Sequence, residues 1–193
     1  MKKVISLVLI LCMCFSLTAC FGDENDPKNQ NAKTVSILVP NSFFKTFDAS
    51  KRELKEEITD LGPNFYTDVD LEKDGVLVTM TPEQRTSLIE YYAARYEDYV
   101  DDIEALGKGC GVAGSDSYKE IVFVVDASTP KKARKAAEDA ITEMLKNYAI
   151  NQNLSTPPDE INWTITATFS TIGGTDTSIS IPEGTLDYST LWS

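Results

Sequence analysis

Histidine is absent from the 193 residues of this chain, and this absence excludes several kinds of chemistry. Without an imidazole there is no Ser-His or Cys-His pair to activate a nucleophile, and the commonest zinc ligand is missing. Carboxylate-based hydrolysis and a Ser-Lys arrangement would survive this absence, but the sequence has no spacing typical of either. The motifs therefore identify no catalytic, cofactor-binding or metal-ligating residue.

Long apolar runs are also missing, because the longest one, Val4 to Phe15, spans about 12 residues. A helix that crosses the ~30 Å hydrocarbon layer of a membrane needs roughly 20 residues. Lys2 and Lys3 precede the apolar run, and small residues follow it. This arrangement is typical of an export signal, and it disfavours a permanent membrane anchor or a buried strand.

The segment Leu17-Thr18-Ala19-Cys20 resembles the lipobox of bacterial lipoproteins. The resemblance implies that residues 1–19 are a signal peptide that is removed, and that the Cys20 thiol is lipidated, with palmitate among its acyl chains. The mature chain would then be anchored by lipid on the extracytoplasmic face of the cell membrane. Cys12 and Cys14 would leave with the signal, so Cys110 would be the one free thiol and no intramolecular disulfide could form.

Positive charge is scarce, with 18 lysines and arginines against 30 aspartates and glutamates. The predicted signal holds two of these cations and none of the acids, so the mature chain has 16 cations against 30 acids, a net charge of −14. Such a charge repels nucleic acid, and we expect no nucleic-acid partner. Residues 20–33 form a polar tether behind the lipid, and residues 34–193 suit a single domain.

Apolar periodicity and turn residues divide this domain into strands and helices. The predicted strands are 34–39, 65–72, 76–80, 121–125, 161–169 and 178–181, and the predicted helices are 42–61, one from Thr81 and one from Thr129-Pro130. Ser42 would cap the first helix, and Gly62-Pro63 would end it. The second helix has the clearest start, because Thr81-Pro82-Glu83-Gln84 can form a capping box with proline at the first helical position.

The pairing of strands is predicted for one hairpin. A two-residue turn at Asp74-Gly75 would place Leu71 opposite Val78 and Val69 opposite Met80. The continuous apolar run 121–125 predicts a central strand buried on both faces, and the alternation over 161–169 predicts a half-buried, antiparallel-type strand. We expect an α+β fold of two layers, in which helices pack on one face of a mixed or antiparallel sheet of about five strands.

Three segments of the domain resemble a family of uncharacterised exported domains of Gram-positive bacteria. They are Ile37-Leu38-Val39-Pro40-Asn41-Ser42-Phe43-Phe44, the Asp74-Gly75 hairpin leading into a helix, and Tyr118-Lys119-Glu120-Ile121. The resemblance spans most of the mature chain and implies location and fold. It supplies no catalytic residues.

Several local motifs have a structural explanation. Residues 109–114 match G-x-G-x-x-G but follow a helix and precede a strand, the reverse of a dinucleotide site, so we expect a flexible loop with an inert thiol at Cys110. Residues 70–75 open like a calcium loop, but its twelfth position is Thr81, so we favour the solvent face of a strand over weak calcium binding. For Tyr92, Tyr96 and Tyr99 we favour core packing over carbohydrate contact.

Four cations, Lys131, Lys132, Arg134 and Lys135, crowd the first turns of the helix that follows Pro130, where the helix macrodipole disfavours positive charge. They could be solvated, or could pair with Glu138 and Asp139 or with the acidic face between Glu90 and Glu104. They could also contact an anionic wall polymer. We favour solvation or pairing.

These observations favour a non-catalytic binding or interaction module, tethered outside the cytoplasmic membrane, whose partner is an envelope protein or a wall polymer. Two alternatives remain open. One is a carboxylate-dependent enzyme acting on glycans, which requires two carboxylates facing each other across a cleft at ~5–10 Å. The other is a structural subunit of an envelope assembly.

Overall fold

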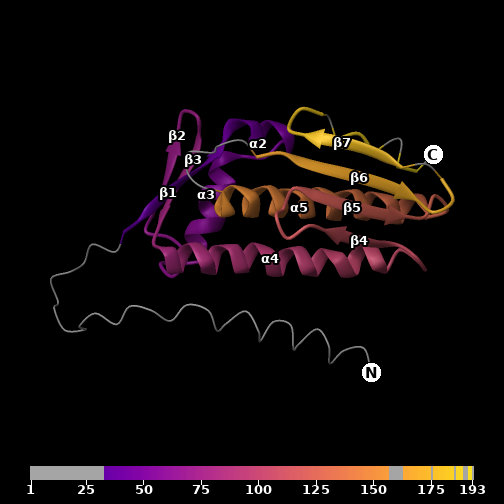
Figure 1. The fold of residues 1–193 in the computed structure, drawn as a ribbon, viewed down its shortest axis with the longest axis horizontal. Coiled ribbons are helices and arrows are strands. Elements are labelled where there is room, and N and C mark those ends of the chain that lie inside the picture. The colour runs from indigo at the N-terminus through magenta and orange to yellow at the C-terminus, as the bar shows by residue number, and fades with distance from the viewer. Residues whose placement is uncertain (1–32, 157–162, 175, 185, 189–190, 193) are drawn as a thin grey trace, which may run out of the picture. The chain divides into compact units, whose positions relative to one another are not determined.

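The strands of this protein form two separate sheets. The computed structural model describes residues 33–156, 163–174, 176–184, 186–188 and 191–192, and Lys33 to Ser193 form one compact unit. The predicted signal peptide and Cys20, and the tether up to residue 32, lie outside the described residues. Figure 1 shows the elements in chain order.

The first sheet has the order β1-β3-β2 and is antiparallel throughout, and the second has the order β4-β5-β6-β7. The strands are β1 (Val35–Pro40), β2 (Asp68–Glu72), β3 (Gly75–Met80), β4 (Gly111–Gly114), β5 (Glu120–Val125), β6 (Ile165–Thr171) and β7 (Thr177–Ile181). In the second sheet β5 and β6 are parallel, and the two outer pairs are antiparallel. The α+β class and the mixed or antiparallel pairing are confirmed.

The division into two sheets differs from the single sheet of about five strands that the sequence predicts. Periodicity identifies a strand but not its neighbour. β1 pairs with the hairpin that follows it, whereas β5 and β6 are joined through a helix. Strand β4 lies inside the segment expected to be a flexible loop, so that interpretation is wrong for residues 111–114. Strand β6 is parallel to β5 as well as antiparallel to β7, and the first two residues predicted for it, 161 and 162, lie outside the described residues.

The helices are α2 (Asn41–Thr46), α3 (Lys51–Asp60), α4 (Pro82–Glu104) and α5 (Lys131–Ser155). The capping box predicted for α4 is confirmed: the Gln84 backbone N–H donates to Thr81 Oγ1 at 3.3 Å, and the Thr81 N–H donates to Gln84 Oε1 at 2.8 Å. The amide of Gln84 also donates to the carbonyls of Pro63 and Tyr66. This one glutamine therefore fixes both the start of α4 and the loop before β2.

The single helix predicted over residues 42–61 is wrong, because the chain breaks it into α2 and α3. Asp48 has a φ of 48°, which interrupts a right-handed helix, and Ser50 then begins a new one. The Ser50 hydroxyl accepts the N–H groups of Arg52 and Glu53, as an N-cap residue does. Ser42 does not cap a helix; its hydroxyl accepts a hydrogen bond from Trp163 Nε1 at 3.1 Å.

The hairpin of β2 and β3 is shifted by two residues from the predicted register. Val69 lies opposite Val78 and Leu71 opposite Val76, so the turn is Lys73-Asp74 and Gly75 belongs to β3. A two-residue shift keeps each side chain on its face of the sheet, so Val69 is still buried. Leu71 is displaced beyond the core and is 49% exposed.

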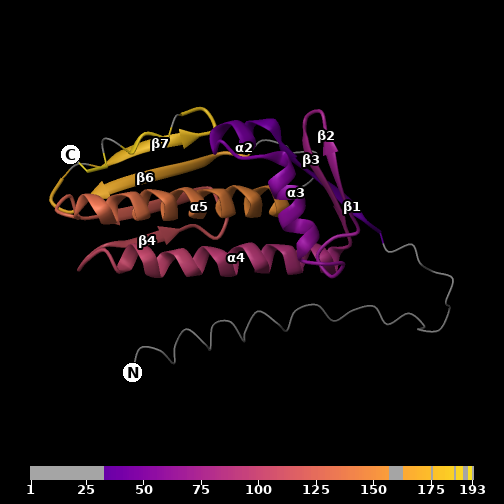
Figure 2. The same cartoon turned by 180° about the vertical axis from the view of Figure 1, so that it is seen from behind.

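Helix α5 covers one face of the four-stranded sheet, and α4 lies alongside α5 (Figures 1 and 2). The strands bury alternate side chains toward α5: Ile121, Phe123 and Val125 from β5, and Ile165, Ala167 and Phe169 from β6. Val122 and Val124 are only half-buried, so the prediction that this strand is buried on both faces is wrong. The opposite face carries hydroxyl groups, among them the hydrogen-bonded Thr168 and Ser178.

Gly75 provides a test of the observed register. A Cβ atom at this position would lie 2.0 Å from the carbonyl oxygen of Val39 on the neighbouring strand, and this backbone atom cannot move without breaking the sheet. We expect Gly75→Ala to lower the free energy of unfolding by about 2 kcal/mol, which corresponds to a melting temperature lower by roughly 4–8 °C.

The matched control is Gly111→Ala in β4, where a Cβ would meet nothing within 4 Å. This variant should melt close to the wild type in the same calorimetric scan. Equal melting temperatures for the two variants would contradict the observed placement of Gly75 against β1.

Candidate functional site

A small charged pocket of about 90 Å³ lies between the α2–α3 segment, α4 and α5, and we call it the charged pocket. Its apolar walls include Phe43, Leu54 and Ile150, and its polar walls are formed by Ser50, Glu53, Glu57, Tyr92, Arg95, Glu143, Lys146 and Asn147. Three carboxylates and two cations thus line a space with room for a few water molecules or a ligand of similar size.

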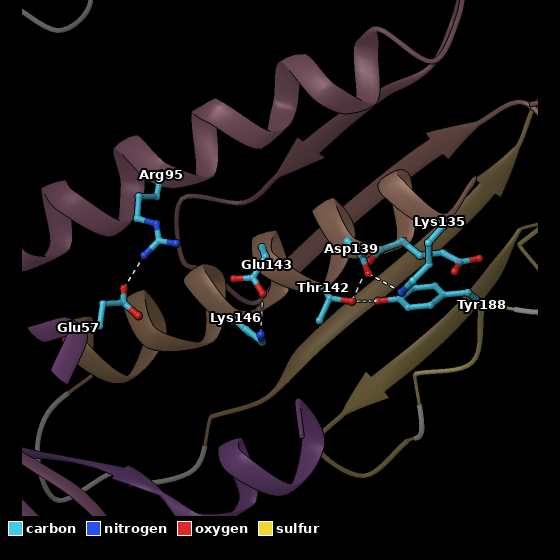
Figure 3. Close-up of polar contacts among 9 residues, drawn as sticks. Glu57, Arg95, Lys135, Asp139, Thr142, Glu143, Lys146 and Tyr188 are labelled. Carbon is cyan, nitrogen blue, oxygen red and sulfur yellow. Dashed lines mark hydrogen bonds and ion pairs between the residues drawn. The ribbon is translucent and has the colours of Figure 1, made fainter. Parts of the chain in front are cut away.

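Two ion pairs form the walls of this pocket (Figure 3). Arg95 Nη1 of α4 lies 2.5 Å from Glu57 Oε1 of α3, and Lys146 Nζ lies 2.6 Å from Glu143 Oε1 one turn earlier on α5. The four side chains are between 24% and 34% exposed. Arg95 also donates to the hydroxyl of Tyr91 at 3.4 Å and lies over the Tyr91 ring. The ion pair of Glu57 and Arg95 therefore connects α3 to α4.

The carboxyl group of Glu57 has a raised pKa. Desolvation by burial is the largest cause, and the neighbouring charge of Glu143 acts in the same direction. The charge of Arg95 lowers the pKa of Glu57 but does not outweigh burial. The carboxyl group of Glu57 therefore keeps its proton to a pH above its ordinary pKa of 4.5.

Two buried polar atoms of the charged pocket lack a hydrogen-bond partner in the part of the chain that the structure describes. They are the hydroxyl of Tyr92 and the side-chain nitrogen of Asn147. The Tyr92 hydroxyl nevertheless lies close enough to the Glu57 carboxylate to lower the pKa of Glu57. Tyr92 is 0% exposed and Asn147 is 2% exposed, so bulk water does not satisfy them. An unsatisfied buried polar group costs about 1–3 kcal/mol. Both groups can donate, so an acceptor oxygen bound in the pocket would remove this cost.

Of the residues that line this pocket, the sequence indicates only Tyr92 as a candidate for ligand contact, and there core packing is the favoured interpretation. The sequence holds one sign of this site, which is Arg95. It lies on the tyrosine-rich side of α4, with Tyr91 and Tyr92 one turn before it and Tyr99 one turn after it. A cation in such a position requires an anionic partner. Its partner Glu57 comes from α3, and sequence spacing cannot indicate that contact.

The four cations at the start of α5 do not act as one cluster. Lys131 and Lys132 are exposed, whereas Arg134 donates to the carbonyl oxygens of Thr129 and Ala127 at 2.8 Å each. The Arg134 guanidinium also lies 5.3 Å from the ring centroid of Trp192. The positive charge of Arg134 therefore meets carbonyl oxygens of the preceding loop, which explains why it is tolerated at this helix start.

One of the two predicted pairs within α5 forms. Lys135 Nζ lies 2.6 Å from Asp139 Oδ1, and both side chains are exposed, so water screens the pair and it contributes little to stability. Glu138 does not pair with Arg134, because its Oε1 accepts a hydrogen bond from Trp192 Nε1 at 2.9 Å. Among the described residues no cation of this helix start pairs with the acidic face of α4.

The other sequence motifs have structural roles. Tyr92 is buried, and Tyr96 and Tyr99 pack half-buried against the core. Cys110 is 9% exposed, and desolvation by burial raises the pKa of its thiol, which supports an inert thiol. In the hairpin, the ammonium group of Lys51 donates to the carbonyls of Glu72 and Lys73 at 3.0 Å each. A lysine thus occupies the turn carbonyls, and Asp68, Asp70 and Glu72 are exposed as predicted.

Comparisons with protein families, with curated proteins and with solved structures find no match to this chain. No helix among the described residues is long and apolar enough to cross a membrane. Within the same residues, no group of three or more cysteine, aspartate or glutamate side chains could hold a metal ion. Function therefore has to follow from the chemistry of the chain itself.

The raised pKa of Glu57 predicts a pH dependence of stability. Because the folded protein holds this proton to a higher pH than the unfolded chain, the contribution of Glu57 falls as the pH rises from about 4.5 through the folded-state pKa. The free energy of unfolding of the wild type minus that of Glu57→Gln should therefore decrease over this range in urea titrations.

Glu56→Gln is the control, because Glu56 is the exposed neighbour of Glu57 on the same helix. Its difference from the wild type should show no comparable decrease with pH. If the free energy of unfolding of the wild type minus that of Glu57→Gln rises with pH instead, desolvation does not outweigh the ion pair with Arg95.

Proposed function

We propose that this protein is a lipid-anchored, extracytoplasmic binding module that takes a small polar ligand, or a polar group of a larger partner, in its charged pocket. The lipobox-like segment ending at Cys20 supports the anchor and the location. The partner is an envelope protein or a wall polymer, and the protein acts without catalysis.

One observation carries the binding proposal: the Tyr92 hydroxyl and the Asn147 amide nitrogen are buried and unpartnered in the same pocket. Because Glu57 and Glu143 are already paired with Arg95 and Lys146, the hydrogen-bond donors left unused in the pocket are neutral, and Glu53 is its carboxylate outside these two ion pairs. A carboxylate or amide oxygen is the matching acceptor. The pocket of about 90 Å³ is smaller than the 300–1,000 Å³ typical of sites for drug-sized ligands. It therefore suits a terminal group such as an acetate or an acetamide.

The lipid anchor is tested by labelling. We expect Cys20→Ala to abolish incorporation of labelled palmitate in a bacterial host that processes lipoproteins, and to move the chain out of the membrane fraction. Cys14→Ala, which removes a thiol from the predicted signal, should leave both properties unchanged. A membrane-bound and labelled Cys20→Ala protein would contradict the assignment of Cys20 as the lipidated residue.

The pocket is tested by NMR titration of the mature chain carrying Cys20→Ala, with acetate and acetamide as probes. We expect chemical-shift changes at the backbone amides around Glu57 and Asn147, and their loss in Tyr92→Phe. Tyr92→Phe keeps the buried ring, and circular dichroism should show that this variant is folded. Tyr66→Phe, outside the pocket, should bind as the wild type does. Equal binding by Tyr92→Phe would refute the role of the hydroxyl.

A carboxylate-dependent hydrolase is the second candidate, because Glu57, with a raised pKa, shares a pocket with Glu143. Glycoside hydrolysis uses two carboxyl groups that face each other across a cleft, one of them a general acid with a raised pKa. Release of reducing sugars from cell-wall glycan by the wild type, lost in both Glu57→Gln and Glu143→Gln, would favour this candidate over the binding module.

A further inference from the structure

A second pocket, of about 200 Å³, lies where α4, the turn between β4 and β5, and α5 meet, and we call it the tyrosine pocket. Three aromatic residues line it, one from each of these elements: Tyr96, Tyr118 and Tyr148. Two carboxylates, Glu97 and Asp116, complete its polar lining. None of these five residues belongs to the charged pocket.

The rings of Tyr96 and Tyr118 both pack against the ring of Tyr148. Tyr148 forms the floor, being only 3% exposed. The Tyr96 ring is tilted by 32° from the Tyr148 ring at a centroid distance of 5.6 Å, and the Tyr118 ring stands at 77° to it at 5.1 Å. Tyr96 and Tyr118 are half-buried. The three rings therefore pack against one another, and the two half-buried ones, Tyr96 and Tyr118, are the rings of this pocket that solvent can reach.

Hydrogen bonds hold this arrangement in place before any ligand binds. The Tyr148 hydroxyl donates to the carbonyl oxygens of Ser115 at 2.6 Å and Glu120 at 3.1 Å. The Ser115 hydroxyl accepts the backbone N–H groups of Lys119 and Glu120. This turn holds Tyr118 at a φ of 55°, a conformation uncommon for a bulky residue. A rigid pocket loses little conformational entropy when it binds a ligand.

The charge of the pocket has one sign. Its lining residues include two carboxylates and no cation, and Glu97 and Asp116 form no ion pair within the described residues. Both carboxylates are exposed. Desolvation by burial raises the pKa of Tyr96 to about 12, and desolvation followed by the charge of Asp116 raises that of Tyr118. The tyrosines thus stay neutral, and their ring faces attract positive charge.

We propose that the tyrosine pocket binds an alkylammonium group. Aromatic faces within about 6 Å of a cation, supplemented by carboxylates, are the chemistry that recognises quaternary and primary ammonium groups. Such a group could belong to a choline-type headgroup or to a lysine side chain of a partner. Sugars also stack on tyrosine, but stacking alone does not require a pocket whose charge is only negative.

The test uses calorimetric titration of the mature chain carrying Cys20→Ala with three probes: choline, n-butylammonium, and the uncharged isostere of choline in which a tert-butyl group replaces trimethylammonium. We expect a cation to bind about tenfold more tightly than the isostere. Tighter binding of choline would indicate a quaternary headgroup, and tighter binding of n-butylammonium a lysine side chain.

Matched variants locate the site. Tyr118→Leu removes one ring of the pocket and should weaken binding about tenfold. Glu97→Gln, at an exposed position that tolerates substitution, should weaken binding several-fold, and its exposed neighbour Asp98→Asn should not. Circular dichroism confirms folding of each variant. Equal affinity for the isostere, or unchanged binding by both Tyr118→Leu and Glu97→Gln, would overturn the proposal.

Discussion

The burial of α5 is the constraint on which the rest of this structure depends. From Met144 to Leu154 nearly every residue of this helix is buried, including the polar residues Asn147, Asn151, Gln152 and Asn153. Each buried amide must find partners or destabilise the fold. Gln152 exchanges two hydrogen bonds with the backbone of Thr164 and so fixes the chain just before β6. In the orientation that satisfies both of its atoms, the Asn151 amide binds Ile89 O and Ala93 N of α4 at 3.2 Å each. The side-chain amides of α5 thus specify where β6 and α4 lie. The burial of apolar side chains alone would not fix these positions.

The two pockets follow from the same burial. Asn147 and Tyr148 are consecutive on α5, about 100° apart around the helix axis, and they line different pockets. The hydroxyl of Tyr148 is satisfied by the β4–β5 turn, whereas the amide nitrogen of Asn147 is not satisfied by any described residue. One helix therefore provides a preorganised aromatic floor to the tyrosine pocket and an unpartnered donor to the charged pocket. A ligand in either pocket would contact the helix that holds the core together, and would stabilise the fold by mass action.

Local signals in the sequence predicted the elements, and tertiary contacts decided what those signals could not. The capping box at Thr81 and Gln84, the helix end at Gly62 and the alternation over Ile165 to Phe169 each depend on residues a few positions apart, and each is observed. The break at Asp48 was missed because it depends on Ser50 capping a second helix while Ser42 binds the distant Trp163. The predicted hairpin register is wrong because it assigns Gly75 to the turn. A glycine is needed at this position because the backbone of Val39 in β1 lies too close for a Cβ atom. Both pockets combine residues from three elements far apart in sequence, so their composition could not be predicted from spacing.

The absence of histidine also limits how the charge of the two pockets can change with pH. No side chain of this protein ordinarily changes charge between about pH 5 and 8. In the tyrosine pocket, raised pKa values keep Tyr96, Tyr118 and Tyr148 protonated, so the negative charge of that pocket comes from its carboxylates alone. In the charged pocket, burial moves the titration of Glu57 upward, toward neutral pH. When Glu57 takes up a proton, Arg95 loses the charge of its partner and becomes free to attract an anion. The charged pocket therefore becomes less negative as the pH falls through the raised pKa of Glu57.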